Sequence, residues 1–363
     1  MRCNSFISEC LAQRGIETVF ALAGASYTHL LVELRNRGFH IVSSRHESGT
    51  IGAADGYSRV SNRPGIALIV ADQGLANAVA GLAVAQQAES AVLVFATSLK
   101  LLVGADPKPE VELASTVCKD IYIATDAGAL CDVLPTALDA AMQVPSGPTM
   151  LLTPPGMFTA DIERSGPTEQ ESKPTPLHRK HVLKKAAQWM ESSQHPIIIL
   201  GRGARQSPHR GAIGSMAREH GIPVLMNGMG RGVIEEDHDL GFSWPYAQLA
   251  AAEADVVLVL GSRLGMRFGH GRHPRFSRAV RFIHVDLNPE HLTQSPTGSL
   301  SVLADPGEFC RALDPLLREK LRGCGYQRQW LHDRLVARDQ RVAELKNRSE
   351  EHTSELQSQF RIS

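Results

Sequence analysis

The stretch IVSSRHESGTIGAADGYSR, residues 41–59, passes from a short apolar run through Arg45, His46 and Glu47 into a row of small residues. An apolar strand that ends where a helix begins is the junction at which α/β proteins place their ligands. Glu47 has no Asp, Cys or second Glu beside it to form a catalytic pair. It is therefore either a helix-start residue, stabilised by the helix dipole, or an acid whose chemical partner lies outside this chain.

The same strand-then-helix unit recurs along the whole chain. The clearest strand-like runs are TVFALAG, GIALIVAD, AVLVFATS and PTMLLTPP in the first half, and PIIILGRG, IPVLMNG, DVVLVLGS and RFIHVDL in the second. Continuous apolar runs are typical of strands that are buried on both faces of a parallel sheet. Their alternation with Ala-rich helical stretches predicts an α/β fold with two parallel-sheet domains.

Composition shifts divide the chain. We predict a first domain over residues 1–158, a linker rich in Pro, Glu and Ser over 159–177, and a second domain over 178–305. A charged, Leu-spaced pattern predicts a helical connection over 306–346. Within 347–363, the string RSEEHTSELQS resembles the translation of a sequencing adapter, so we interpret this tail as read-through and expect the natural protein to continue. The alternative interpretation is a solvated polar tail.

Charge and cysteine usage exclude several classes of protein. Lys plus Arg and Asp plus Glu number 38 each, which argues against nucleic acid or an anionic membrane as a partner. No apolar run is long enough to cross a bilayer. The six cysteines lack CxxC or Cys/His metal spacing, which predicts free thiols in the cytoplasm and no metal site formed by this chain.

Several motifs together resemble thiamine-diphosphate enzymes, most closely the acetolactate synthase and benzaldehyde lyase branch. The motifs RHE at residues 45–47, ADGYSR at 54–59 and the following Pro-Gly resemble its pyrimidine-binding domain, as do GIETVFALAGAS and DQGLANAVAGLAVAQ. The segments PIIILGRGA, GIPVLMNGMGRGVIEEDH, EADVVLVLGSRLGMRFGHG and FIHVDLNPE resemble its central domain. The resemblance covers nearly all of residues 5–310, and the order of the motifs carries it more than any single one.

This resemblance gives the lone carboxylate a role. It implies that Glu47 is the catalytic acid that bonds to the cofactor pyrimidine, whose imino form then removes the proton from thiazolium C2. It implies cofactor binding by Gly24, Ala25, Glu47, Gly74 and Asn77. The cofactor would be thiamine diphosphate with Mg²⁺. The family holds the diphosphate with a Gly-Asp-Gly motif in a third domain, and this sequence has no such motif. We therefore expect an incomplete cofactor site and no activity from this chain alone.

Four departures from the family pattern concern the substrate side of the site. The loop after the first strand reads ALAG, with Ala23 in place of the family residue. Gln73 replaces part of the family's Gly-Pro-Gly, although Gly74 and Asn77 are kept. Ser26 stands where benzaldehyde lyase has its active-site His, and GADPKPEVEL lacks the family's active-site Gln. Activation by Glu47 survives these departures, whereas the substrate is left open.

A basic segment in the second half is a further candidate site. The sequence GSRLGMRFGHGRHPRFSR brings Arg263, Arg267 and His270 close together along the chain. A solvated basic loop is the simpler interpretation. The resemblance allows FAD here, because acetolactate synthases and some relatives bind it in this domain. The glycine clusters at Gly201 and Gly228 are not GxGxxG fingerprints, and we interpret them as tight turns.

The resemblance implies a transferase or lyase that makes or breaks a carbon–carbon bond next to a carbonyl. Decarboxylation of a 2-oxo acid followed by carboligation, as in acetolactate synthase, is the leading hypothesis. A lyase acting on a 2-hydroxy ketone or a 2-hydroxyacyl-CoA is the alternative within the family. Hypotheses of other classes are a non-catalytic dimerising or regulatory module and a nucleotide-binding oxidoreductase. The expected partners are a small-molecule substrate and further copies of the chain, as a homodimer or homotetramer.

Overall fold

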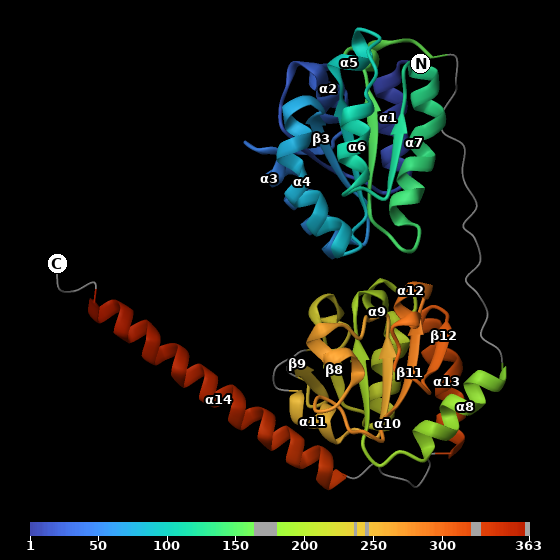
Figure 1. The fold of residues 1–363 in the computed structure, drawn as a ribbon, viewed down its shortest axis with the longest axis vertical. Helices are drawn as coiled ribbons and strands as arrows, with labels where there is room; N and C mark the ends of the chain where they lie inside the picture. The colour runs from blue at the N-terminus through green and yellow to red at the C-terminus, as the bar shows by residue number, and fades with distance from the viewer. Residues whose placement is uncertain (163–179, 236–237, 244–246, 321–327, 360–363) are drawn as a thin grey trace. The chain divides into compact units, whose positions relative to one another are not determined.

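The computed structural model describes residues 1–162, 180–235, 238–243, 247–320 and 328–359. The chain forms two compact units, Met1–Ser172 and Lys173–Ser363, and each is described here by itself. Most of the predicted linker lies outside the described residues, so the predicted domain boundaries stay predictions. Both units are six-stranded parallel sheets with helices, which confirms the prediction of two parallel-sheet α/β domains (Figure 1).

The first sheet runs in the order β2-β1-β3-β4-β6-β5, and all its pairs are parallel. Its central strands are continuous apolar runs that are buried along nearly their full length. The strands are β1 (Thr18–Ala21), β2 (His40–Ser43), β3 (Gly65–Val70), β4 (Val92–Thr97), β5 (Asp120–Ile123) and β6 (Pro148–Thr153).

Two helical layers cover this first sheet (Figure 1). One core packs α1 (Cys3–Gln13), α2 (Thr28–Asn36) and α7 (Ala127–Met142) against one face. The other core packs α3 (Glu47–Ser61), α4 (Asp72–Gln87) and α6 (Lys108–Ser115) against the opposite face. Short helical turns complete the unit as η1 (Ala25–Tyr27), α5 (Leu99–Leu102) and η2 (Met157–Thr159).

The second sheet repeats the architecture in the order β12-β11-β10-β7-β8-β9. Its strands are β7 (Pro196–Leu200), β8 (Val224–Met226), β9 (Gly241–Ser243), β10 (Val256–Leu260), β11 (Arg281–Asp286) and β12 (Leu300–Leu303). Around it lie α8 (Lys180–Glu191), α9 (Arg202–Gln206), α10 (Arg210–His220), η3 (Gly228–Gly230), α11 (Gln248–Glu253), η4 (Met266–Gly271), α12 (Pro289–Thr293) and α13 (Pro306–Lys320).

A long helix, α14 (Arg328–Gln359), follows α13. Its first turns are held to the second unit, because Trp330 Nε1 donates to Glu253 Oε2 at 2.7 Å and Arg338 donates to the Gly241 carbonyl at 2.9 Å. Helices therefore occupy the described part of the segment that the Leu-spaced pattern predicted to be helical. The helix continues past residue 347. This observation does not distinguish adapter read-through from a natural polar tail, so the read-through interpretation stays a prediction.

Each sheet has an interior pair of neighbouring strands at which the strand order reverses, and the first sheet reverses again at its β6-β5 edge. The interior reversal lies between β1 and β3 in the first sheet and between β7 and β10 in the second. At such a point the loops after the two strands diverge and leave a crevice outside their carboxyl ends, where α/β proteins bind ligands. None of the described helices combines the length and hydropathy that crossing a membrane requires.

Candidate functional site

Glu47 is the first residue of α3 and lies outside the carboxyl end of β2. Its side chain is 8% exposed, although carboxylates are seldom buried without a partner. The capping role at this helix start belongs to its neighbour, because His46 Nδ1 accepts from the Ser48 backbone N–H at 3.2 Å. The dipole still favours a carboxylate here, but helix capping does not account for where the Glu47 oxygens lie.

The Glu47 carboxylate instead meets the start of α4. Asn77 Nδ2 donates to Glu47 Oε2 at 3.0 Å, across 30 residues of sequence. Ser48 Oγ donates to the Asn77 carbonyl at 2.8 Å, so the same two helix starts are tied twice. A Cβ atom on Gly74 would lie 2.9 Å from Glu47 Oε1, and only glycine leaves that side of the carboxylate open. The fold thus brings Glu47, Gly74 and Asn77 together, while their roles stay predictions.

The second oxygen of this carboxylate is free within the described part of the chain. Glu47 Oε1 receives no hydrogen bond from any residue that the structure describes. Oε1 is not one of the fully buried polar atoms that lack a partner in the described residues, so solvent reaches it and a ligand or a water can occupy the position beside Gly74. The free oxygen beside Gly74 is therefore the feature of this unit that most directly indicates a ligand.

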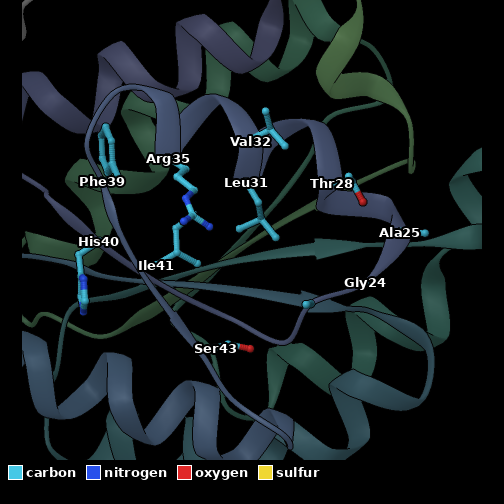
Figure 2. A pocket seen from close by; sticks show the side chains of 11 residues that line it. Gly24, Ala25, Thr28, Leu31, Val32, Arg35, Phe39, His40, Ile41 and Ser43 are labelled. Carbon is cyan, nitrogen blue, oxygen red and sulfur yellow. The ribbon is translucent and has the colours of Figure 1, made fainter.

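Gly24 and Ala25 lie on the neighbouring loop after β1, apart from that carboxylate. Together with Ala23 they line a pocket of about 790 Å³ between α2 and β2, whose lining does not include Glu47 (Figure 2). The loop is anchored by Tyr27, whose hydroxyl lies 2.6 Å from the Ile69 carbonyl oxygen and 2.9 Å from that of Phe95. Burial raises the pKa of Tyr27, so its hydroxyl stays protonated and donates to these carbonyls.

Sequence reasoning missed two residues that position this site, Ser48 and Tyr27. Ser48 stands next to Glu47 at a helix start, but its hydroxyl bonds to the Asn77 carbonyl 29 residues away, and no local sequence signal indicates that partner. Tyr27 left no sequence signal, because its two carbonyl partners lie on β3 and β4, which only the folded sheet places beside it. Of the family departures, Gln73 is exposed at the second position of α4.

In the second unit the predicted basic residues lie after β10, near the reversal of strand order. Arg263, Arg267 and His270 are exposed, and Arg267 Nη1 donates to Asn227 Oδ1 at 3.1 Å. His270 has a positive φ of 54°, which is uncommon for a residue other than glycine. A Cβ at Gly201 or Gly230 would collide with backbone of another segment, so close approach favours glycine there, and the tight-turn interpretation stays a prediction.

Metal ligands do not gather in either unit as far as the structure describes the chain. No three His, Cys, Asp or Glu side chains lie close enough there to hold an ion. At the Glu47 site the described residues provide one carboxylate, whose Oε2 is bonded to Asn77 and whose Oε1 lies beside Gly74. Such a group can accept or share a proton with a ring nitrogen that is placed beside Gly74.

Family profiles match both units. The profile for the N-terminal TPP binding domain of thiamine pyrophosphate enzymes matches residues 1–101, and the profile for their central domain matches residues 183–313. The chain belongs to the thiamine pyrophosphate enzymes. Thiamine pyrophosphate is another name for thiamine diphosphate, so the resemblance that the sequence motifs indicated is confirmed. Glu47, Gly74 and Asn77 lie within the first match, and Arg263, Arg267 and His270 lie within the second.

Relatives of this thiamine pyrophosphate enzyme chain fall into two groups. A probable acetolactate synthase of Mycobacterium bovis is 33% identical over 282 residues, which cover 75% of this chain and 50% of that protein. The 2-hydroxyacyl-CoA lyase 1 of Dictyostelium discoideum is 27% identical over 301 residues, covering 80% of this chain and 51% of that protein. A chloroplastic acetolactate synthase of Arabidopsis thaliana is 27% identical over 330 residues, which cover 86% of this chain and 48% of that protein. The chain spans about half the length of these relatives.

Proposed function

We propose that Glu47 activates thiamine diphosphate in an enzyme that makes or breaks a carbon–carbon bond next to a carbonyl. Acetolactate synthase-like decarboxylation and carboligation of 2-oxo acids is the first candidate reaction. The observation that carries the proposal is the buried Glu47 carboxylate, with Oε2 fixed by Asn77 and Oε1 free beside Gly74. When it is bound, the cofactor supplies a nucleophilic thiazolium carbon.

The residues of this chain fit the pyrimidine end of that cofactor. Glu47 Oε1 would share a proton with the pyrimidine ring nitrogen, and the Asn77 hydrogen bond would hold the carboxylate in place for it. Gly74 would leave room for the ring, because any side chain there would fill the space beside Oε1. The diphosphate and Mg²⁺ are assigned by resemblance to a further domain, so no residue of this chain is proposed to hold them.

The second candidate reaction is cleavage of a 2-hydroxyacyl-CoA. It is supported by the relatives named as 2-hydroxyacyl-CoA lyases, which match this chain over as large a share as the acetolactate synthases do. The two candidates separate in an assay of the complete gene product with pyruvate and with a 2-hydroxyacyl-CoA. Release of CO₂ from pyruvate supports the first reaction, and release of an aldehyde with formyl-CoA supports the second.

The outer face of α3 and α4 supports a second copy of this chain as a partner. Gly49, Gly52 and Gly56 follow one another along the exposed side of α3, and none of them has a positive φ. At Gly52 and Gly56 a Cβ would meet nothing within 4 Å, so no contact within the unit requires glycine. Glycine in a helix costs about 0.5–1 kcal/mol relative to Ala. Close approach of another backbone would explain that cost.

The neighbouring helix continues this surface with small side chains. Ala76, Ala80 and Val84 are exposed at helical spacing on α4, which packs along α3. The face made by these six residues starts beside Glu47 and contains no charged side chain. We therefore propose that two copies pair through this face, as a homodimer or as half of a homotetramer, with a Glu47 close to each side of the interface.

Replacing Gly52 and Gly56 with Ala tests this pairing. As an unpaired chain, the double variant should be more stable, because Ala favours the helix. The free energy of unfolding should rise by up to about 1 kcal/mol per site. We expect weaker self-association, because two added methyl groups would hold the backbones apart. Sedimentation equilibrium over a range of concentrations measures the second effect. Gly211→Ala, at an exposed helical glycine of α10 with open space around it, is the matched control. Unchanged self-association of the double variant refutes the pairing face.

We also propose that the loop after β10 binds an anionic nucleotide, with FAD as the candidate. The support is the cluster of Arg263, Arg267 and His270 at a reversal of strand order, with Arg267 held by Asn227. We expect chain that is incubated with FAD to keep the flavin's visible absorption through gel filtration, and Arg267→Gln to lose most of it. Chain that elutes colourless in both forms contradicts a flavin site.

The cytoplasm is the proposed compartment. All five cysteines in the described part of the chain are buried free thiols, which suits a reducing environment. A chain from gently lysed cells that carries a disulfide would contradict this placement.

A further inference from the structure

The pocket between α2 and β2 has a lining that no proposed step uses. It measures about 790 Å³, within the range of small-molecule sites. Part of its lining is apolar and consists of Leu31 and Val32 on α2, Ile41 on β2 and Phe39 directly before β2 (Figure 2). Val32 is 53% exposed, so this apolar lining lies open to solvent. An open apolar lining in a concave site favours a ligand with a hydrocarbon part.

Arg35 is the one permanently charged side chain in the described lining of this pocket. Arg35 and His40 line it, and none of its described lining residues is acidic. Figure 2 shows the Arg35 side chain reaching from α2 toward Ile41, across the hollow. The Arg35 guanidinium makes no hydrogen bond or ion pair with any residue that the structure describes. The occupant that matches this charge is an anion.

Arg37, the C-cap residue of α2, is by contrast an arginine whose side chain is bonded within the protein. Its guanidinium lies 2.6 Å from Glu33 Oε1 and 3.2 Å from Glu9 Oε1. Arg35 has neither partner and lies over the apolar lining instead. The last turn of α2 and its C-cap therefore provide one arginine that is bonded within the protein, Arg37, and one that is presented to the pocket, Arg35.

We propose that this pocket binds a small aliphatic carboxylate. Its carboxylate pairs with the fork of donors on Arg35, a geometry that arginine matches with two parallel hydrogen bonds. Its hydrocarbon chain lies on Leu31, Val32 and Ile41. One permanent charge on a mostly apolar lining suits a monoanion with a chain better than a phosphate, which needs more donors.

The pocket and the Glu47 site are separate. The pocket ends at Gly24, Ala25 and Ser43, at the carboxyl ends of β1 and β2, while Glu47, Gly74 and Asn77 lie outside its lining. The inference therefore does not depend on the proposed function and would stand if Glu47 had no role in catalysis. A bound acid would touch the loop that starts at Gly24, whose Gly24 and Ala25 the family resemblance assigns to the cofactor.

Hexanoate is the probe for this site, titrated into the full 363-residue chain and followed by saturation-transfer NMR. We expect saturable millimolar binding, and binding at least about tenfold weaker in Arg35→Gln, because a charge-assisted pair is lost. The melting temperature of Arg35→Gln should match that of the parent, since Arg35 supports no described contact. Arg37→Gln, at the C-cap of the same helix, is the matched control and should keep hexanoate affinity.

Ligand controls separate the parts of the proposal. Hexanol lacks the charge and acetate lacks the chain, so each should bind more weakly than hexanoate. Inorganic phosphate should compete poorly. Equal affinity of hexanol and hexanoate, effective competition by phosphate, or full hexanoate affinity in Arg35→Gln would each overturn the assignment, as would the lack of saturable binding.

Discussion

Replacement of Glu47 with Gln is expected to slow exchange of the C2 proton of bound thiamine diphosphate by about 10²–10⁴-fold, the range typical of a lost acid–base group. The amide keeps the size of the side chain but cannot share a proton with the pyrimidine nitrogen as a carboxyl group can. NMR of quenched samples, after transfer of the complete gene product into D₂O with cofactor and Mg²⁺, measures the exchange rate.

The control for this variant lies on the same helix. Asp55 is also a buried carboxylate of α3, and both its oxygens bond to Arg59, at 2.8 and 2.6 Å, away from Gly74. Asp55→Asn should lower stability modestly and leave C2 exchange at the parent rate. Unchanged exchange in Glu47→Gln would falsify the assigned role, and equal losses in both variants would point to damage to α3 as a whole.

Gly65→Ala is expected to have the largest effect on stability, with a loss of about 3 kcal/mol or more in the first unit. Gly65 begins β3, and a Cβ there would collide with the Ala54 carbonyl oxygen and lie 2.6 Å from its carbon. These are backbone atoms of α3, which cannot rotate away as a side chain can. The helix would have to lift from the sheet, and it would carry Glu47 with it.

Urea unfolding of the chain measures this loss, and the contrast with Gly56→Ala makes it specific. Gly56 lies on the outer side of the same helix with open space around it, so Ala there should raise the free energy of unfolding by up to about 1 kcal/mol. Each substitution adds one methyl group. At Gly65 the methyl enters the contact between α3 and β3, whereas at Gly56 it lies on the solvent side of α3. Similar effects of both would contradict the close packing of α3 on β3.

The strands that sequence reasoning found and missed differ in where they lie in the sheets. β3, β4, β7 and β10 are interior strands, and their continuous apolar runs were recognised. The missed strands β5, β9 and β12 all lie at sheet edges and are three or four residues long. An edge strand contacts fewer neighbours and needs fewer apolar residues, as the half-exposed pattern of β5 shows.

The sequence motifs predicted which residues belong to the candidate site but not the contacts between them. Glu47, Gly74 and Asn77 could be chosen from the motifs at residues 45–47 and 72–86, because the family pattern marks their positions. The hydrogen bond between Asn77 and Glu47 depends on how α3 lies along α4, which no linear spacing records. The pocket around Arg35 has no motif at all, since its lining comes from a helix and a strand that only the fold brings together.

Two hydrogen bonds join the starts of α3 and α4, the helices that carry both Glu47 and the proposed pairing face. Asn77 binds the Glu47 carboxylate through its side chain and Ser48 through its carbonyl, so the two helix starts are joined at two points. A contact that shifts or stiffens their outer face therefore acts on the carboxylate as well. Thermodynamic linkage makes this coupling reciprocal. If a ligand that binds Glu47 raises the affinity of self-association by some factor, self-association raises the affinity for that ligand by the same factor. A ligand titration at two protein concentrations would measure both effects.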